Sequence, residues 1–154
     1  MGKELLFRKI SIVIFVLFTG VLLSSCKYAV PDEKRVDVIS EIAVTVKDNY
    51  SSEDVETPYQ ISMDNVDELA DKNSYLHKAV EKYDDVKGYR VYLLENNMVL
   101  VVTDVVFQKV EGYVVSDEEL EGTLTVPGLG FDADMVSVFE RIGDRNIYSV
   151  SAGL

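Results

Sequence analysis

Residues 89–115, YRVYLLENNMVLVVTDVVFQKVEGYVV, decide the fold of this 154-residue chain. Valine, tyrosine and leucine dominate the stretch, and these residue types favour β-strands. The polar run Glu95-Asn96-Asn97 divides it and is typical of a turn. We therefore predict two strands, over Tyr89–Leu94 and Met98–Phe107, and a third strand over Lys109–Val115.

Further short strands are predicted on both sides of this stretch. Upstream, Pro58–Ser62 is expected to be a short extended segment. Downstream, Thr123–Val126 ends at a Pro-Gly turn, and Met135–Ile142 and Ile147–Val150 are separated by a polar, glycine-containing turn. These segments are expected to join a mostly antiparallel sheet.

One amphipathic helix is predicted before the first long strand, beginning at Asp64 as the N-cap. Its apolar stripe recurs at spacings of three and four, is interrupted only at Asn73, and consists of Val66, Leu69, Leu76, Val80 and Tyr83. Gly88 follows its expected end, where a left-handed residue often terminates a helix. The predicted fold is thus α+β, with one main amphipathic helix packed on a mostly antiparallel sheet of five to seven strands.

The segment Val36–Lys47 fits two structures. Residues 42–47 alternate in hydrophobicity, which suits a strand with one buried face. A helical stripe is also visible, with Asp32 as a candidate N-cap, and consists of Val36, Ile39, Ala43 and Val46. Because seven of the twelve residues are β-branched, we predict a strand here.

The first 26 residues have the organisation of an export signal. Three basic residues, Lys3, Arg8 and Lys9, precede the apolar run Ile10–Leu23. A run of about 14 residues suits a signal peptide and is shorter than the ~20 residues that span a bilayer. It ends in Leu23-Ser24-Ser25-Cys26, which contains the only cysteine of the chain. These four residues resemble the lipobox of bacterial lipoproteins.

The resemblance implies that the Cys26 thiol receives a diacylglyceryl group and that the chain is cut after Ser25. Two acyl chains suffice for stable anchoring, whereas one is marginal. We therefore expect an exported protein, lipid-anchored to the bacterial cell membrane and facing outward. The predicted divisions are a signal peptide over residues 1–25, a polar tether over 26–35 and a single domain over 36–154.

The charge of the chain limits its partners. The full sequence has a formal net charge of −12, and removal of residues 1–25 leaves 12 basic and 26 acidic residues, near −14. So acidic a protein is unsuited to nucleic acid, and its domain is expected to contact the membrane only through the lipid on Cys26. A cationic protein or another envelope protein remains a candidate partner. The expected contact surface is a run of acidic residues at helical spacing, Asp64, Asp67, Glu68 and Asp71.

Two groups of residues are candidates for catalysis or metal binding. His77, the only histidine, has Glu81 one helical turn later and could act as a general base, although a polar position on a helix flank is the simpler interpretation. The carboxylates of Asp132, Asp134 and Glu140 could bind calcium or hydrolyse glycosides. However, close acidic pairs are expected by chance in so acidic a chain. We predict no metal, no other cofactor and no enzymatic activity.

The function expected from the sequence is therefore that of a non-enzymatic binding or accessory module of the cell envelope. One alternative is an inhibitor or immunity lipoprotein that captures a cationic secreted protein such as a muramidase. Another is an envelope hydrolase that uses the carboxylates named above. Tyrosines can also line a sugar- or peptide-binding surface, and Tyr89 and Tyr113, near strand ends, are the candidates for exposure.

Overall fold

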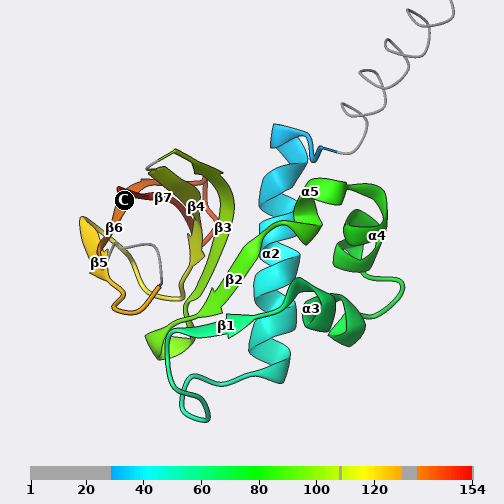
Figure 1. The fold of residues 1–154 in the computed structure, drawn as a ribbon, viewed down its shortest axis with the longest axis horizontal. Coiled ribbons are helices and arrows are strands. Elements are labelled where there is room, and N and C mark those ends of the chain that lie inside the picture. Colours follow the sequence, from blue (N-terminus) through cyan, green and yellow to red (C-terminus); the bar gives the residue numbers. More distant parts are fainter. Residues whose placement is uncertain (1–28, 108, 130–134, 154) are drawn as a thin grey trace, which may run out of the picture.

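The protein has an α+β fold, in which helices cover one face of a curled antiparallel sheet (Figure 1). The structure is a computed structural model that describes residues 29–107, 109–129 and 135–153. The predicted signal peptide, Ser25 and Cys26 lie outside the described residues, as do Asp132 and Asp134.

The sheet has seven strands in the order β1-β2-β3-β4-β7-β6-β5, and each neighbouring pair is antiparallel. The strands are β1 (Tyr59–Ile61), β2 (Arg90–Leu93), β3 (Val99–Val106), β4 (Lys109–Val115), β5 (Thr123–Thr125), β6 (Met135–Arg141) and β7 (Ile147–Gly153). Every strand predicted from residue 58 onward is confirmed, and β7 extends three residues beyond the predicted end at Val150.

Two β-bulges bend the sheet. Thr103 is an extra residue in β3, because Val102 pairs with Gly112 whereas Asp104 pairs with Glu111. Phe139 is the corresponding extra residue in β6, since the pairing shifts between Val138 and Glu140. A bulge bends its strand and increases the local twist. Strands β3 to β6 accordingly curve round on themselves, as Figure 1 shows on the side away from the helices.

The sheet separates two hydrophobic cores. Alternate residues of β2 and β3, among them Val91, Leu93 and Val101, are buried against the helices. The intervening residues, such as Leu100 and Val102, are buried inside the curl of the sheet. Because successive side chains of a strand point to opposite faces, a continuous run of valine and leucine supplies both cores.

The segment predicted as a strand, Val36–Lys47, is instead part of helix α2 (Asp32–Asn49). Its buried residues are Val38, Ile39, Ile42, Ala43, Thr45 and Val46, a helical pattern. The strand prediction was wrong because tertiary burial outweighs the modest preference of β-branched residues for strands. The N-cap is Pro31, and Asp32 is the first helical residue.

The single helix predicted from Asp64 to Gly88 is not confirmed. The chain instead forms α3 (Met63–Leu69), α4 (Tyr75–Lys82) and the short α5 (Asp84–Lys87). Among the described residues, α2, α3 and α4 are therefore the helices with seven or more residues. Between α3 and α4, Asp71 Oδ1 accepts a hydrogen bond from Asn73 N, and Ser74 Oγ accepts one from His77 N. Aspartate and serine favour such turns and caps over a continuous helix.

Residues before the predicted domain start at Val36 take part in the packed structure. Val30 is buried, and its backbone N–H lies 3.2 Å from both carboxylate oxygens of Asp85. Residues 32–35, predicted to belong to the tether, form the first turn of α2. Among the described residues, no helix combines the length and hydrophobicity needed to cross a bilayer.

Gly112 permits the close approach of β3 and β4 at the first bulge. A Cβ atom at this position would collide with the carbonyl oxygen of Val101. We therefore expect Gly112→Ala to lower the free energy of unfolding by about 2 kcal/mol or more, as forced overpacking does. Urea denaturation followed by circular dichroism measures the change.

Gly122→Ala is the matched control. Gly122 has a φ of +75° and open space around its Cβ position, so alanine there should cost only about 1 kcal/mol of backbone strain. Equal losses of stability in the two variants would contradict the close-approach explanation.

A polar groove between helix α2 and the sheet

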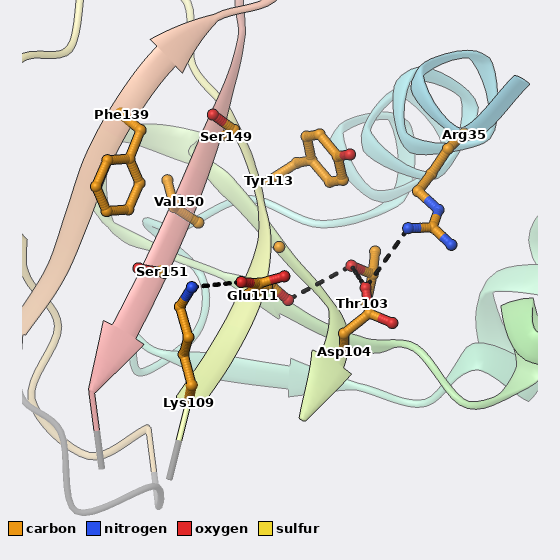
Figure 2. A pocket seen from close by; sticks show the side chains of 11 residues that line it. Arg35, Thr103, Asp104, Lys109, Glu111, Tyr113, Phe139, Ser149, Val150 and Ser151 are labelled. Carbon is orange, nitrogen blue, oxygen red and sulfur yellow. Dashed lines mark hydrogen bonds and ion pairs between the residues drawn. The ribbon is translucent and has the colours of Figure 1, made fainter. Parts of the chain in front are cut away.

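A groove of about 370 Å³ lies where the first turn of α2 meets the sheet (Figure 2). It is on the face of the sheet that the helices cover, which we call the outer face because it points away from the inside of the curl. Its size falls within the range of pockets that bind small ligands or single side chains. Four strands and one helix supply its walls, with Arg35, Thr103, Asp104, Lys109, Glu111, Gly112, Tyr113, Phe139, Ser149, Val150 and Ser151.

The alternation of β4 and β7 explains why this wall is polar. Lys109, Glu111 and Tyr113 point to the outer face, while the intervening Val110 and Val114 are buried in the core within the curl. Across the strand pair, Tyr113 lies opposite Ser149 and Glu111 lies opposite Ser151. Cross-strand register thus gathers an aromatic ring, a carboxylate and two hydroxyl groups into one wall.

Both bulges contribute a side chain to the groove. Thr103 Oγ1 donates a hydrogen bond to Asp104 Oδ2 at 2.8 Å, which orients this carboxylate. Phe139, at the second bulge, is 67% exposed although it is one of the largest apolar side chains of the sheet. It also borders a second hollow of about 270 Å³ beside residues 119–122. The Phe139 side chain therefore stands between two concave surfaces.

The charged groups of the groove are paired with one another. Arg35 Nη1 lies 3.5 Å from Asp104 Oδ2, and Lys109 Nζ lies 2.6 Å from Glu111 Oε1. Burial lowers the pKa of Arg35, but the nearby Tyr89, Asp104, Tyr113 and Asp32 outweigh it and raise the pKa. Arg35 Nε is buried without a hydrogen-bond partner in the protein.

Tyr89 is buried beside Arg35 but does not line the groove. Burial, together with the charge of Asp85, raises the pKa of Tyr89 to about 12, against the opposing effect of Arg35. Its hydroxyl is buried near the Arg35 guanidinium but makes no well-aligned hydrogen bond with the protein. Of the two tyrosines named as candidates for exposure, Tyr89 is buried, whereas Tyr113 is half-buried and lines the groove.

The predicted acidic surface does not form as expected. Asp64 and Glu68 are exposed on α3, but Asp71 lies beyond the end of that helix at Leu69. Asp67 turns toward α4, where its carboxylate lies 3.1 Å from His77 Nδ1. The four residues therefore share no continuous helical face, because the helix ends before the last of them.

His77 connects two helices and does not line the groove. Its Nδ1 faces Asp67 of α3, and its Nε2 lies 3.3 Å from Glu81 Oε1 on its own helix. Glu140 is exposed on β6, one residue after Phe139. Among the described residues, no group of three or more histidine, cysteine, aspartate or glutamate side chains could hold a metal ion.

Sequence reasoning missed Arg35, Thr103 and Phe139 as residues of a common site. The alternation Lys109-Val-Glu111-Gly-Tyr113 could have placed three of the other residues on one face, and a glycine within a strand is a known signal for a bulge. Nothing in the sequence indicated that α2 would cover that face.

Comparison with known proteins does not add to this description. The chain matches no protein-family model, no curated protein and no solved structure at a significant level.

The raised pKa of Tyr89 predicts a loss of stability in alkali. The folded state retains a proton that an unfolded tyrosine releases near pH 10, so the free energy of unfolding should fall between pH 10 and about 12. We expect Tyr89→Phe to make this decline shallower. At neutral pH the variant should be about as stable as the wild type, because the buried hydroxyl makes no well-aligned hydrogen bond that phenylalanine would lose.

Urea denaturation at about pH 8 and pH 11 measures both effects. Equal declines in the two proteins, or a large loss of stability in the variant at pH 8, would contradict the assignment.

Proposed function

We propose that this protein is an exported, lipid-anchored protein of the bacterial cell envelope whose domain is a non-enzymatic binding module. The anchor rests on the signal-like residues 1–25 and on Leu23-Ser24-Ser25-Cys26, in which the sole cysteine follows two small residues. In this proposal the Cys26 thiol carries the lipid, and the domain faces outward from the membrane.

The observation that carries the binding role is the exposed Phe139 between two hollows of the sheet surface. An aromatic side chain surrounded by polar groups is typical of the residues that dominate protein-binding energies. The hydroxyl groups of Tyr113, Ser149 and Ser151 line the same groove and offer hydrogen-bonding groups to a partner.

The pairing of charges favours binding over catalysis. Arg35 faces Asp104, and Lys109 faces Glu111, so the charged groups of the groove neutralise one another. We therefore propose that the groove holds a ligand and does not transform it.

A loop of another envelope protein is the proposed ligand. The groove is open and has room for a few residues, not for a folded domain. A loop could place one polar side chain in each hollow and pack its backbone across the Phe139 ring. The four acidic residues expected to capture a cationic protein do not share one helix, and Asp67 faces His77, so we prefer this partner to the inhibitor alternative.

Replacement of Cys26 tests the anchor. We expect Cys26→Ala to leave an unprocessed precursor without acyl chains, because alanine has no thiol to form the thioether with the lipid. Mass spectrometry of the purified chain reports both processing and acylation. Normal processing of the variant, or a wild-type protein without acyl chains, would reject the lipoprotein proposal.

Site-specific photo-crosslinking tests the binding surface in intact cells. We expect a photoreactive amino acid in place of Phe139 to form a discrete adduct with a second envelope protein. The control position is Leu69, which is also exposed (43%) but lies at the end of α3. Equal adducts at both positions, or none at Phe139, would contradict the proposal.

A further inference from the structure

The hairpin between β3 and β4 carries an apolar tip that the folded domain does not bury. Val105, Val106 and Phe107 are 47%, 58% and 96% exposed. Phe107 also has a positive φ of 54°, a conformation that is uncommon for a bulky residue. We call these three residues the hairpin tip. Adjacent exposed apolar side chains of this kind mark surfaces that contact a protein or a membrane.

The hairpin tip lies at the end of the molecule where the chain enters the domain. Arg35, in the first turn of α2, contacts Asp104, which precedes the tip by one residue. At about 3.3 Å per strand residue, Phe107 is about 10 Å from this contact. In Figure 1, the blue start of α2 and the far end of β3 occupy the same end of the molecule.

The length of the preceding chain keeps the lipid anchor near the tip. Cys26 precedes Asp32, the first residue of α2, by six positions. Six residues span at most about 20 Å even when fully extended. An acyl chain on Cys26 therefore holds this end of the domain, including the hairpin tip, close to the bilayer surface.

We infer that the hairpin tip inserts into the bilayer that holds the lipid anchor. This inference rests on the proposed lipid attachment, and it replaces the expectation that the lipid would be the sole membrane contact. Aromatic and aliphatic side chains bind stably at the boundary between headgroups and acyl chains. The bilayer is favoured over other occupants because the chain itself delivers the tip to it.

The charges beside the tip are compatible with this contact. The carboxylates of Asp104 and Glu111 would be repelled by anionic lipids if they were unpaired. Each has a basic partner, Arg35 for Asp104 and Lys109 for Glu111. Repulsion from the strongly acidic domain is thus reduced where the tip would meet the membrane.

Insertion would also orient the groove. Asp104, which directly precedes the tip, and Lys109, which pairs with Val106 across the hairpin, both line the groove. With the lipid and the tip both in the membrane, the domain has two attachment points, and the groove opens close to the headgroups. Its partner would then be a protein segment that lies close to the outward-facing surface of the membrane.

Depth-dependent fluorescence quenching tests the inference. The full chain is expressed with its own signal, purified in its processed form, and reconstituted in phosphatidylethanolamine–phosphatidylglycerol vesicles. Phe107→Cys is labelled with an environment-sensitive fluorophore, and Val106→Cys provides a second position in the tip. Val44→Cys, also exposed (55%) but nine residues along α2 from Arg35, is the control.

We expect lipids with a nitroxide on the acyl chain to quench the labels at Phe107 and Val106 several-fold, and to leave the label at Val44 unchanged. A blue shift of the tip labels should accompany the quenching. Equal quenching at all three positions, or none at the tip of a vesicle-bound protein, would overturn the inference. A blue shift without nitroxide quenching, together with a cross-linked dimer, would overturn it in favour of a second copy covering the tip.

Mass spectrometry of the same sample separates this inference from the proposed function. An acylated Cys26 together with a solvent-exposed tip would overturn membrane insertion alone. A chain without acyl groups on Cys26 would overturn both.

Discussion

The burial of α2 between the sheet and the smaller helices is the constraint on which the rest of the structure depends. Val38, Ile39, Ile42 and Val46 are completely buried in the core that also holds the helix-facing residues of β2 and β3. Deleting a buried aliphatic side chain of this size typically costs 2–5 kcal/mol. The same helix covers one side of the sheet and carries Arg35 to the groove, so core packing and the proposed site share one element.

The groove depends as much on backbone irregularity as on side chains. Thr103 and Phe139 are the extra, unpaired residues of the two β-bulges, and both line the groove. Gly112 allows the strands to approach opposite the first bulge, since a Cβ atom would collide with Val101 there. Regular strands would keep alternate side chains in step across the sheet. The bulges break that order and leave Phe139 on the exposed side.

The polar and the apolar surfaces of the domain have separate proposed roles. The groove offers hydroxyl groups, paired charges and one aromatic ring, which suits a protein loop. The described residues of the hairpin tip are two valines and a phenylalanine, which suits a bilayer. Since both surfaces adjoin Asp104 and Lys109, one hairpin connects the proposed membrane contact to the proposed binding site.

By itself, the sequence determined the strands from residue 58 onward, because their runs of valine, tyrosine and leucine between turn residues leave few alternatives. It also supplied the lipobox-like motif, which is local and needs no tertiary contact to be read. The alternation in Lys109–Val115 also holds enough information to place Lys109, Glu111 and Tyr113 on one face, although we did not predict a site from it.

Only the tertiary structure decided the state of Val36–Lys47, where strand propensity and helical periodicity conflict and burial against the sheet selects the helix. It also ended α3 before Asp71 and turned Asp67 toward His77. Tertiary contacts also bring Arg35, Thr103 and Phe139 together in one groove. Propensity and periodicity act over a few neighbouring residues, whereas these positions depend on contacts between segments up to about a hundred residues apart, which the local sequence does not specify.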